Sequence, residues 1–99
     1  MADNIANKVL TLNEKWENTD KTTIAENVEK HLYSKFPECS ANWSVKVEKI
    51  SEITGSKPDT VFAWFNRGRP NVKVPFLKLC KIADYLGSDV AEFFKQTEN

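Results

Sequence analysis

The chain has 99 residues, of which 40% are hydrophobic, and it contains three Trp, two Tyr and six Phe. This is enough apolar material for one small domain, since a chain of this size buries roughly 60–70% of its unfolded surface. Two cysteines are too few for a disulfide framework, and we expect free thiols. No apolar run approaches the roughly 20 residues of a membrane-spanning helix. The N-terminus lacks the apolar region of a signal peptide, so we expect a cytoplasmic protein.

The formal net charge is zero, but the charged residues are unevenly distributed along the chain. Residues 1–43 hold five Lys and seven acidic residues, which is a net charge of −2. Residues 44–82 hold eight Lys or Arg and three acidic residues (+5), and residues 83–99 hold one Lys and four acidic residues (−3). A basic middle segment is typical of a surface that faces phosphate groups. The alternative is a solvated, dipolar surface with no partner.

Two amphipathic helices are predicted in the first third of the chain. The first covers residues 3–17, where apolar side chains recur at spacings of four, three and four residues: Ile5, Val9, Leu12 and Trp16. The second begins at Asp20 or Thr22 as its cap and ends before Pro37, because the residue that precedes a proline disfavours the helical conformation. Its apolar stripe comprises Ile24, Val28, Leu32 and Phe36.

The next predicted helix runs from Trp43 to Thr54, after a loop over residues 38–42. Its cap is Ser40, Asn42 or Ser44. Trp43 shares a stripe with Val47 and Ile50, and this position favours a place in the core. Gly55 ends the helix, because glycine turns the chain with a positive φ at little cost.

A second short helix restarts almost at once after Gly55. Ser56 and Asp59 have the spacing of a capping box, and Pro58 suits the first helical turn. The apolar residues expected in the core are Val61, Trp64 and Phe65. A short helix, a glycine turn and another short helix form a helix-turn-helix pattern.

The remainder of the chain predicts a turn and two helices. The turn is Asn66-Arg67-Gly68-Arg69-Pro70-Asn71. One helix follows Val74 and Pro75 and ends at Gly87, and a last short helix covers residues 89–95 with Ser88 as its cap. The expected buried residues are Phe76, Leu79, Cys80, Ala83, Leu86, Val90, Phe93 and Phe94. The count is six helices and no convincing strand, which predicts a small all-α bundle.

Residues 44–94 resemble a known family. The stretches TGSKPDTVFAWFNRGRPN and VPFLKLCKIADYLGSDVAEFF are similar to the lambda-repressor-like (Cro/CI-type, XRE) helix-turn-helix family. The resemblance implies a DNA-binding domain over residues 20–96. Residues 1–19 have no counterpart in the minimal domain of that family, and we expect their amphipathic helix to serve dimerisation or partner binding, or to pack on the core. It also implies a cytoplasmic prokaryotic or phage-encoded regulator, most simply a repressor, that binds double-stranded DNA as a homodimer without a cofactor.

The resemblance further implies that the helix at residues 57–66 lies in the DNA major groove. Its base-facing residues would be Lys57, Asp59, Thr60, Phe62 and Ala63. The residues along the phosphate backbone would be Ser44, Lys46, Asn66, Arg67, Arg69 and Lys73. The base-facing set is unusually apolar at Pro58, Phe62 and Ala63, so phosphate and shape contacts are expected to contribute more than usual.

Two other classes of function are a protein-binding module and an enzyme. A protein-binding module on the same scaffold, such as an inhibitor, antirepressor or antitoxin, would use the face formed by Phe62 and Ala63. An enzyme is disfavoured, because His31 is the only histidine and the sequence has no phosphate-cradling glycine loop. No catalytic residue and no metal ligand is predicted.

Overall fold

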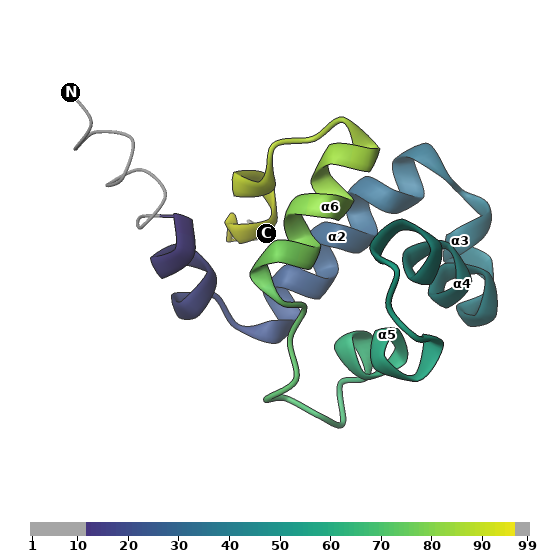
Figure 1. The fold of residues 1–99 in the computed structure, drawn as a ribbon, viewed down its shortest axis with the longest axis horizontal. Helices are drawn as coiled ribbons and strands as arrows, with labels where there is room; N and C mark the ends of the chain where they lie inside the picture. Colours follow the sequence, from purple (N-terminus) through teal and green to yellow (C-terminus); the bar gives the residue numbers. More distant parts are fainter. Residues whose placement is uncertain (1–11, 97–99) are drawn as a thin grey trace.

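The computed structural model describes residues 12–96, and every regular element in this range is helical (Figure 1). The elements are a helical segment at residues 12–18, α2 (Lys21–Lys35), α3 (Glu38–Ala41), α4 (Trp43–Thr54), α5 (Pro58–Phe65), α6 (Phe76–Leu86) and the 3-10 helix η1 (Val90–Phe94). The predicted all-α class is therefore confirmed for the described part of the chain. Within residues 12–96, no helix is both long and apolar enough to cross a membrane.

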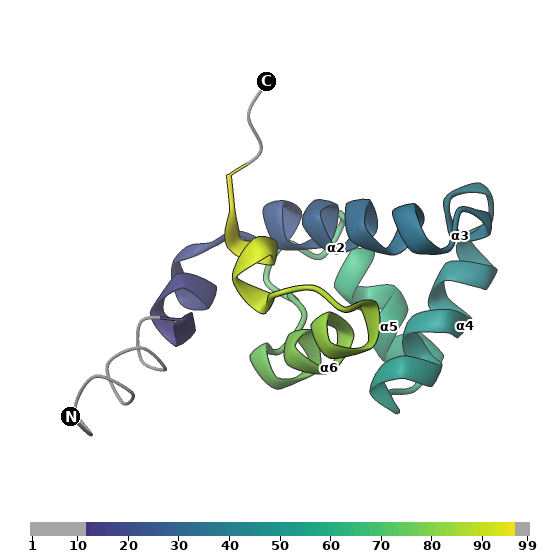
Figure 2. The ribbon, with the colours of Figure 1, turned by 90° about the horizontal axis from the view of Figure 1, so that it is seen from above.

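Helix α2 is the central element of the fold. Figure 2 shows α2 running along one side of the molecule, with α4, α5 and α6 beneath it. Helix α2 packs against α3, α5, α6 and η1, while α4 packs against α3, α5 and α6. The predicted stripe of α2 is confirmed at Ile24, Val28 and Leu32, which are completely buried. Phe36 lies just past the end of α2 and is only partly buried against the core. The other core side chains with no more than 3% exposure are Cys39, Ile50, Val61, Trp64, Phe65, Val74, Leu79, Ile82, Ala83 and Phe93.

The ends of the helices are fixed mainly by local chemistry. The Asp20 carboxylate accepts a hydrogen bond from the backbone N–H of Thr23 at 3.2 Å and caps α2. Asn42 caps α4 by accepting from the N–H groups of Ser44 and Val45 at 2.8 and 3.3 Å. Gly55 ends α4 with φ of +73°, and Gly87 ends α6 with φ of +70°. The predicted helix ends at Gly55 and Gly87 are therefore confirmed. Of the alternative caps, Asp20 rather than Thr22 caps α2, and Asn42 rather than Ser40 or Ser44 caps α4.

The structure differs from the sequence prediction at several helix ends. Residues 38–41 form the one-turn helix α3 rather than a loop. Ser56 is not the cap of α5, because Lys57 occupies that position and makes no side-chain capping bond. The last helix is a 3-10 helix capped by Asp89, which accepts from the N–H of Ala91 at 3.0 Å, rather than a helix capped by Ser88.

The N-terminal prediction is only partly covered by the described residues. Ile5 and Val9 lie outside them. Leu12 and Trp16 are partly buried and pack against the core. The indole Nε1 of Trp16 donates to the carbonyl of Val74 at 2.7 Å, so this part of the chain is fastened to the segment that precedes α6.

Candidate functional site at the α4–α5 face

Helices α4 and α5 are joined by a turn that is stabilised by hydrogen bonds of Thr54, at the end of α4, and of Lys78, on α6. The buried Thr54 hydroxyl donates to the Ile50 carbonyl at 2.7 Å and accepts from the N–H of Ser56 at 3.3 Å. Lys78, on α6, donates to the Thr54 carbonyl at 3.1 Å and satisfies the C-terminal end of α4. Gly55 then reverses the chain, and α5 begins three residues later, at Pro58. The direction of α5 relative to α4 is therefore fixed by hydrogen bonds as well as by packing.

Helix α5 is buried on one face and exposed on the other. Val61, Trp64 and Phe65 lie in the core, as predicted. Four of the proposed base-facing residues are exposed: Lys57, Asp59, Thr60 and Phe62. The fifth residue of that set, Ala63, is only 8% exposed and belongs to the buried side of the helix. Its carbonyl accepts a hydrogen bond from Lys21, near the point where the chain folds back after α5.

The residues predicted along the phosphate backbone divide into two groups. Ser44, Arg67 and Arg69 are exposed. Asn66 is half-buried, and its side-chain oxygen accepts from the N–H of Gly68 at 2.9 Å, so it shapes the turn. The Arg67 guanidinium lies 3.3 Å from the carboxylate of Glu26, but both groups are largely solvated and such pairs contribute little.

Lys46 is not on the exposed face. Its ammonium group pairs with the carboxylate of Glu29 at 2.6 Å, and only 3% of the lysine side chain is exposed. The same ammonium lies 3.9 Å from the ring centre of Trp43 and 4.9 Å from that of Phe65. Burial between two helices therefore removes Lys46 from the predicted phosphate contacts. The spacing within α4 carries no signal of this pairing, because Glu29 belongs to α2.

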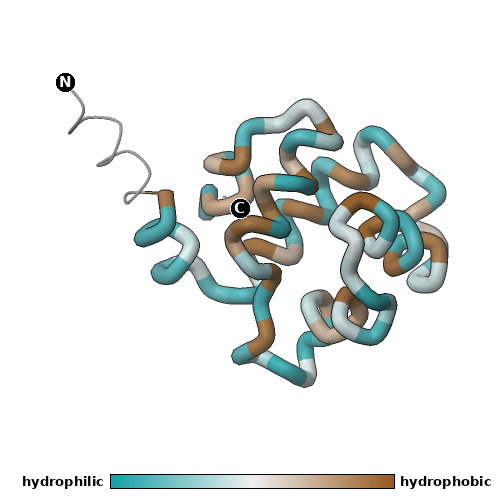
Figure 3. Tube along the Cα trace, in the orientation of Figure 1, coloured by the Kyte–Doolittle hydropathy of each residue, from teal (hydrophilic) through white to brown (hydrophobic). Residues whose placement is uncertain are grey.

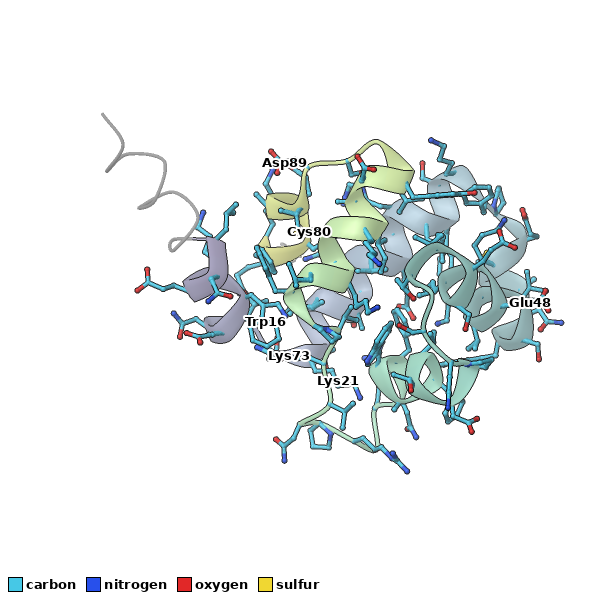
Figure 4. All side chains as sticks on the ribbon, in the orientation of Figure 1. Trp16, Lys21, Glu48, Lys73, Cys80 and Asp89 are labelled. Atoms are coloured by element: carbon cyan, nitrogen blue, oxygen red, sulfur yellow. The ribbon has the colours of Figure 1, made fainter. Side chains whose placement is uncertain are left out.

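Lys73 is also occupied by contacts within the chain. Its ammonium group donates to the carbonyls of Trp16, Glu17 and Thr19, the last two at 3.3 and 2.9 Å, and lies 4.3 Å from the ring centre of Trp16. Figure 4 shows Lys73 beside Trp16. Burial lowers the pKa of the Lys73 amine, although the carboxylates of Glu17 and Asp20 oppose this effect. The half-buried Lys73 thus satisfies carbonyl groups at the C-terminal end of the helical segment at residues 12–18.

Lys21 has a similar environment, which the sequence analysis missed. It is 5% exposed, and its ammonium group donates to the carbonyls of Ala63, Asn66 and Arg69 at 2.7, 2.6 and 2.6 Å. Burial and the nearby positive charge of Arg69 lower the pKa of the Lys21 amine. A lysine that follows a polar capping residue is ordinarily a surface residue, so the sequence offered no clear signal.

An open groove of about 380 Å³ lies between α4 and α5. Its lining residues are Trp43, Ser44, Val47, Glu48, Ser51, Pro58, Asp59 and Phe62. Trp43 is 47% exposed, so the prediction of a core position is wrong; its ring lies 5.3 Å from that of Phe62, which is equally exposed. The Ser51 hydroxyl is buried and has no hydrogen-bond partner among residues 12–96, although it belongs to the lining of the groove.

The described residues offer no arrangement suited to a metal. In residues 12–96, no group of three or more His, Cys, Asp or Glu side chains is placed to hold one. Cys39 is buried and Cys80 half-buried, both are free thiols, and burial raises the pKa of each. His31 packs edge-on against Phe93 at 5.5 Å and lies within hydrogen-bonding distance of the Ser88 hydroxyl. These contacts give His31 a structural place between α2 and the C-terminal elements.

No family model matches the chain, and searches of curated proteins and of solved structures found no significant match.

Proposed function

We propose that the protein is a sequence-specific DNA-binding regulator, acting as a repressor, of the lambda-repressor-like helix-turn-helix class. In this proposal α4 and α5 form the helix-turn-helix, and α5 lies in the major groove of double-stranded DNA. One observation carries the proposal. Gly55 turns the chain between α4 and α5 with φ of +73°, and the exposed Arg67 and Arg69 follow α5 after the half-buried Asn66.

The charges on this face support contact with the DNA backbone. Lys57 precedes α5, while Arg67 and Arg69 follow it, so cations stand at both ends of the helix. Arginine and lysine side chains that neutralise phosphates supply most of the affinity in a protein–DNA complex. Lys46 and Lys73 are left out of the proposed contact surface, because their ammonium groups are bound within the protein.

The exposed side chains of α5 offer a small set of base contacts. Lys57 can donate to the O6 and N7 atoms of guanine, and Asp59 can accept from the amino group of cytosine. Thr60 can donate to a base, while the Phe62 ring suits the methyl group of thymine. Since few polar readers are available, the shape of the DNA and its phosphates contribute a larger share of recognition. The protein acts as a homodimer on a site with two-fold symmetry.

The test is a fluorescence anisotropy titration of labelled genomic fragments at two salt concentrations. The double variant Arg67→Ala and Arg69→Ala should bind at least about tenfold more weakly, and its salt slope should fall by about 1.8 per subunit, or 0.9 for each lost phosphate contact. The double variant Lys30→Ala and Lys35→Ala is the matched control, because both lysines are exposed on α2 and their loss removes two positive charges outside the proposed surface. Absence of binding at low salt, or equal binding by the double variant, would overturn the proposal.

A second candidate function is a protein-binding module, and the groove between α4 and α5 favours it. The exposed rings of Trp43 and Phe62 form the apolar floor of this groove. Ala63, which the sequence predicts beside Phe62 on the protein-binding face, is buried, so Trp43 takes its place there. The exposed carboxylates of Glu48 and Asp59 make no ion pair with any residue in the range 12–96. Such a groove fits a segment with one apolar anchor and an adjacent Lys or Arg.

Selection from a random peptide library on the immobilised protein distinguishes the two functions. If the groove is a protein site, selected peptides share an apolar anchor next to a basic residue, and Trp43→Ser, which changes the groove outside the proposed DNA contacts, abolishes their binding while DNA binding remains. A library with no such consensus removes the second candidate.

A further inference from the structure

The loop between α5 and α6 carries two of the proposed DNA contacts but has little packing of its own. Residues 67–72 are all exposed, and the next core side chain is Val74. Figure 3 shows largely hydrophilic residues in the loop that leads out of α5. Inside the loop, the N–H of Arg69 donates to the Asn66 carbonyl at 3.0 Å, and that of Val72 donates to the Arg69 carbonyl at 3.2 Å. Apolar burial therefore does not hold Arg67 and Arg69 in place.

Lys21 provides the attachment that the loop lacks. An ammonium group has three donors, and those of Lys21 are directed at three carbonyls. One carbonyl, that of Ala63, belongs to the last turn of α5, where carbonyls have no partner within the helix. The other two belong to Asn66 and Arg69, on either side of Arg67. A single buried side chain from α2 thus joins the end of α5 to the backbone of the loop.

Lys73 secures the other end of the same loop. It binds the carbonyls of Trp16, Glu17 and Thr19, and the indole of Trp16 returns a hydrogen bond to the carbonyl of Val74. The loop is thereby attached to α2 at its start and to residues 12–19 at its end. Figure 4 shows Lys21 and Lys73 on the same side of the molecule, near this loop.

We infer that Lys21 is a positioning residue for DNA binding, which fixes the loop so that Arg67 and Arg69 meet successive phosphates. This inference rests on the proposed function. Because Lys21 is almost completely buried, it does not itself reach a phosphate. A loop that is already ordered in the free protein loses less conformational freedom on binding, so its arginines bind more tightly. Without Lys21, the same two arginines are present but their backbone is free to adopt other conformations.

The decisive experiment is a double-mutant cycle between Lys21→Met and the Arg67→Ala, Arg69→Ala pair. DNA affinity and salt slope are measured by anisotropy well below the melting temperature of each variant. Lys21→Met should weaken binding about tenfold and lower the salt slope, yet have almost no further effect once both arginines are gone, because the residues act as one unit. Lys30→Met controls for the loss of one lysine charge on α2.

A purely structural role gives a different pattern. In that case Lys21→Met lowers the melting temperature but leaves the DNA affinity of the folded protein unchanged, or weakens binding equally in both backgrounds. Either outcome overturns the inference. If Lys21→Met does not fold, Lys21→Arg takes its place: it keeps the charge but presents a planar fork that cannot reproduce three converging bonds, so the same reduced slope is expected.

Amide NMR spectra of the DNA-free protein separate this inference from the proposed function. In Lys21→Met the amide signals of Gly68, Arg69 and Val72 should shift and lose protection from hydrogen exchange, while those of α6 remain. Loop amides that are unchanged in the variant overturn the inference even if wild-type protein binds DNA. Failure of wild-type protein to bind DNA overturns the proposed function, whatever the loop amides show.

Discussion

Three lysines of this protein have ammonium groups that find different kinds of partner within the fold. Lys21 is bound by three backbone carbonyls, and Lys73 by three carbonyls and an aromatic ring. Lys46 pairs with a carboxylate and lies over the rings of Trp43 and Phe65. Burying a cation is costly unless such groups replace water. Each lysine therefore joins two parts of the chain, and removing either side of the contact has a structural cost.

The pair formed by Lys46 and Glu29 gives a residue-scale prediction. Glu29→Gln leaves the ammonium buried without a counter-charge, so the free energy of unfolding should fall by about 2 kcal/mol. This is less than for a fully buried pair, because 19% of the Glu29 side chain is exposed. Lys46→Met keeps an apolar stem against the aromatic rings, and its effect should be smaller. Urea unfolding of both single variants and the double variant measures the coupling, and strictly additive effects would contradict a direct pair.

The sequence predicted features that depend on neighbouring residues and missed those that depend on distant ones. The stripe of α2 and the two glycine turns follow from local periodicity and backbone freedom, and the structure has them. The prediction of an exposed Lys46 is wrong, and the role of Lys21 has no signal in the sequence, because their partners lie on another helix or in a distant loop. Trp43 was placed in the core from its spacing, but the first residue of α4 lies beyond the packed part of that stripe.

At the scale of elements, the stability of α2 depends on its N-terminal capping residue, Asp20, as well as on its apolar stripe. Asp20 satisfies one of the free N–H groups at the start of the helix, where the helix dipole also favours a negative charge. This end of α2 also carries Lys21, which holds the loop after α5. Fraying of the first turn of α2 would therefore disturb the loop that bears Arg67 and Arg69.

The Asp20 cap has a predictable dependence on pH. Hydrogen bonding from the side chain of Thr23, together with its backbone N–H, lowers the pKa of the Asp20 carboxyl below its usual value of 3.8, against the opposing effect of burial. A lowered pKa means that the unfolded state binds the proton more readily, so the stabilisation is complete above pH 3.8 and is lost as pH falls through the folded-state pKa. Asp20→Ala should reduce stability by about 1 kcal/mol at neutral pH.

Urea unfolding of wild type and Asp20→Ala between neutral pH and about pH 3 measures this effect. The difference in unfolding free energy should be constant near neutrality and become smaller in acid. Asp20→Asn is the control, since asparagine caps helices as well but does not titrate, and its stability relative to Asp20→Ala should not change with pH. A difference between wild type and Asp20→Ala that is the same at both ends of the range would contradict a role for the ionised cap.

At the scale of the whole molecule, the net charge is zero, but the charges are separated along the chain and the fold exposes some of the cations near the ends of α5. Of the eight cations in the basic middle segment, Lys46 and Lys73 are bound internally, whereas Lys57, Arg67 and Arg69 are exposed near the two ends of α5. The apolar groove with its carboxylates lies between α4 and α5 and shares Asp59 and Phe62 with the proposed base-facing residues. The proposed DNA surface is therefore small, and its affinity should depend strongly on salt and on the number of subunits that bind together.

This dependence allows salt to report the number of subunits on the DNA. With three phosphate contacts per subunit, the slope of log affinity against log salt should be about −2.7 for a monomer and about −5.4 for a homodimer. Raising salt from roughly 50 to 200 mM should thus weaken binding about 40-fold for a monomer and about 2,000-fold for a dimer. The proposed homodimer requires the steeper slope, and the variant lacking Arg67 and Arg69 should lose about 3.6 of it, since two subunits each lose two contacts. A slope near −2.7 that falls to about −0.9 in that variant would show the same contact surface acting as a monomer, and would refute the dimer without refuting the surface.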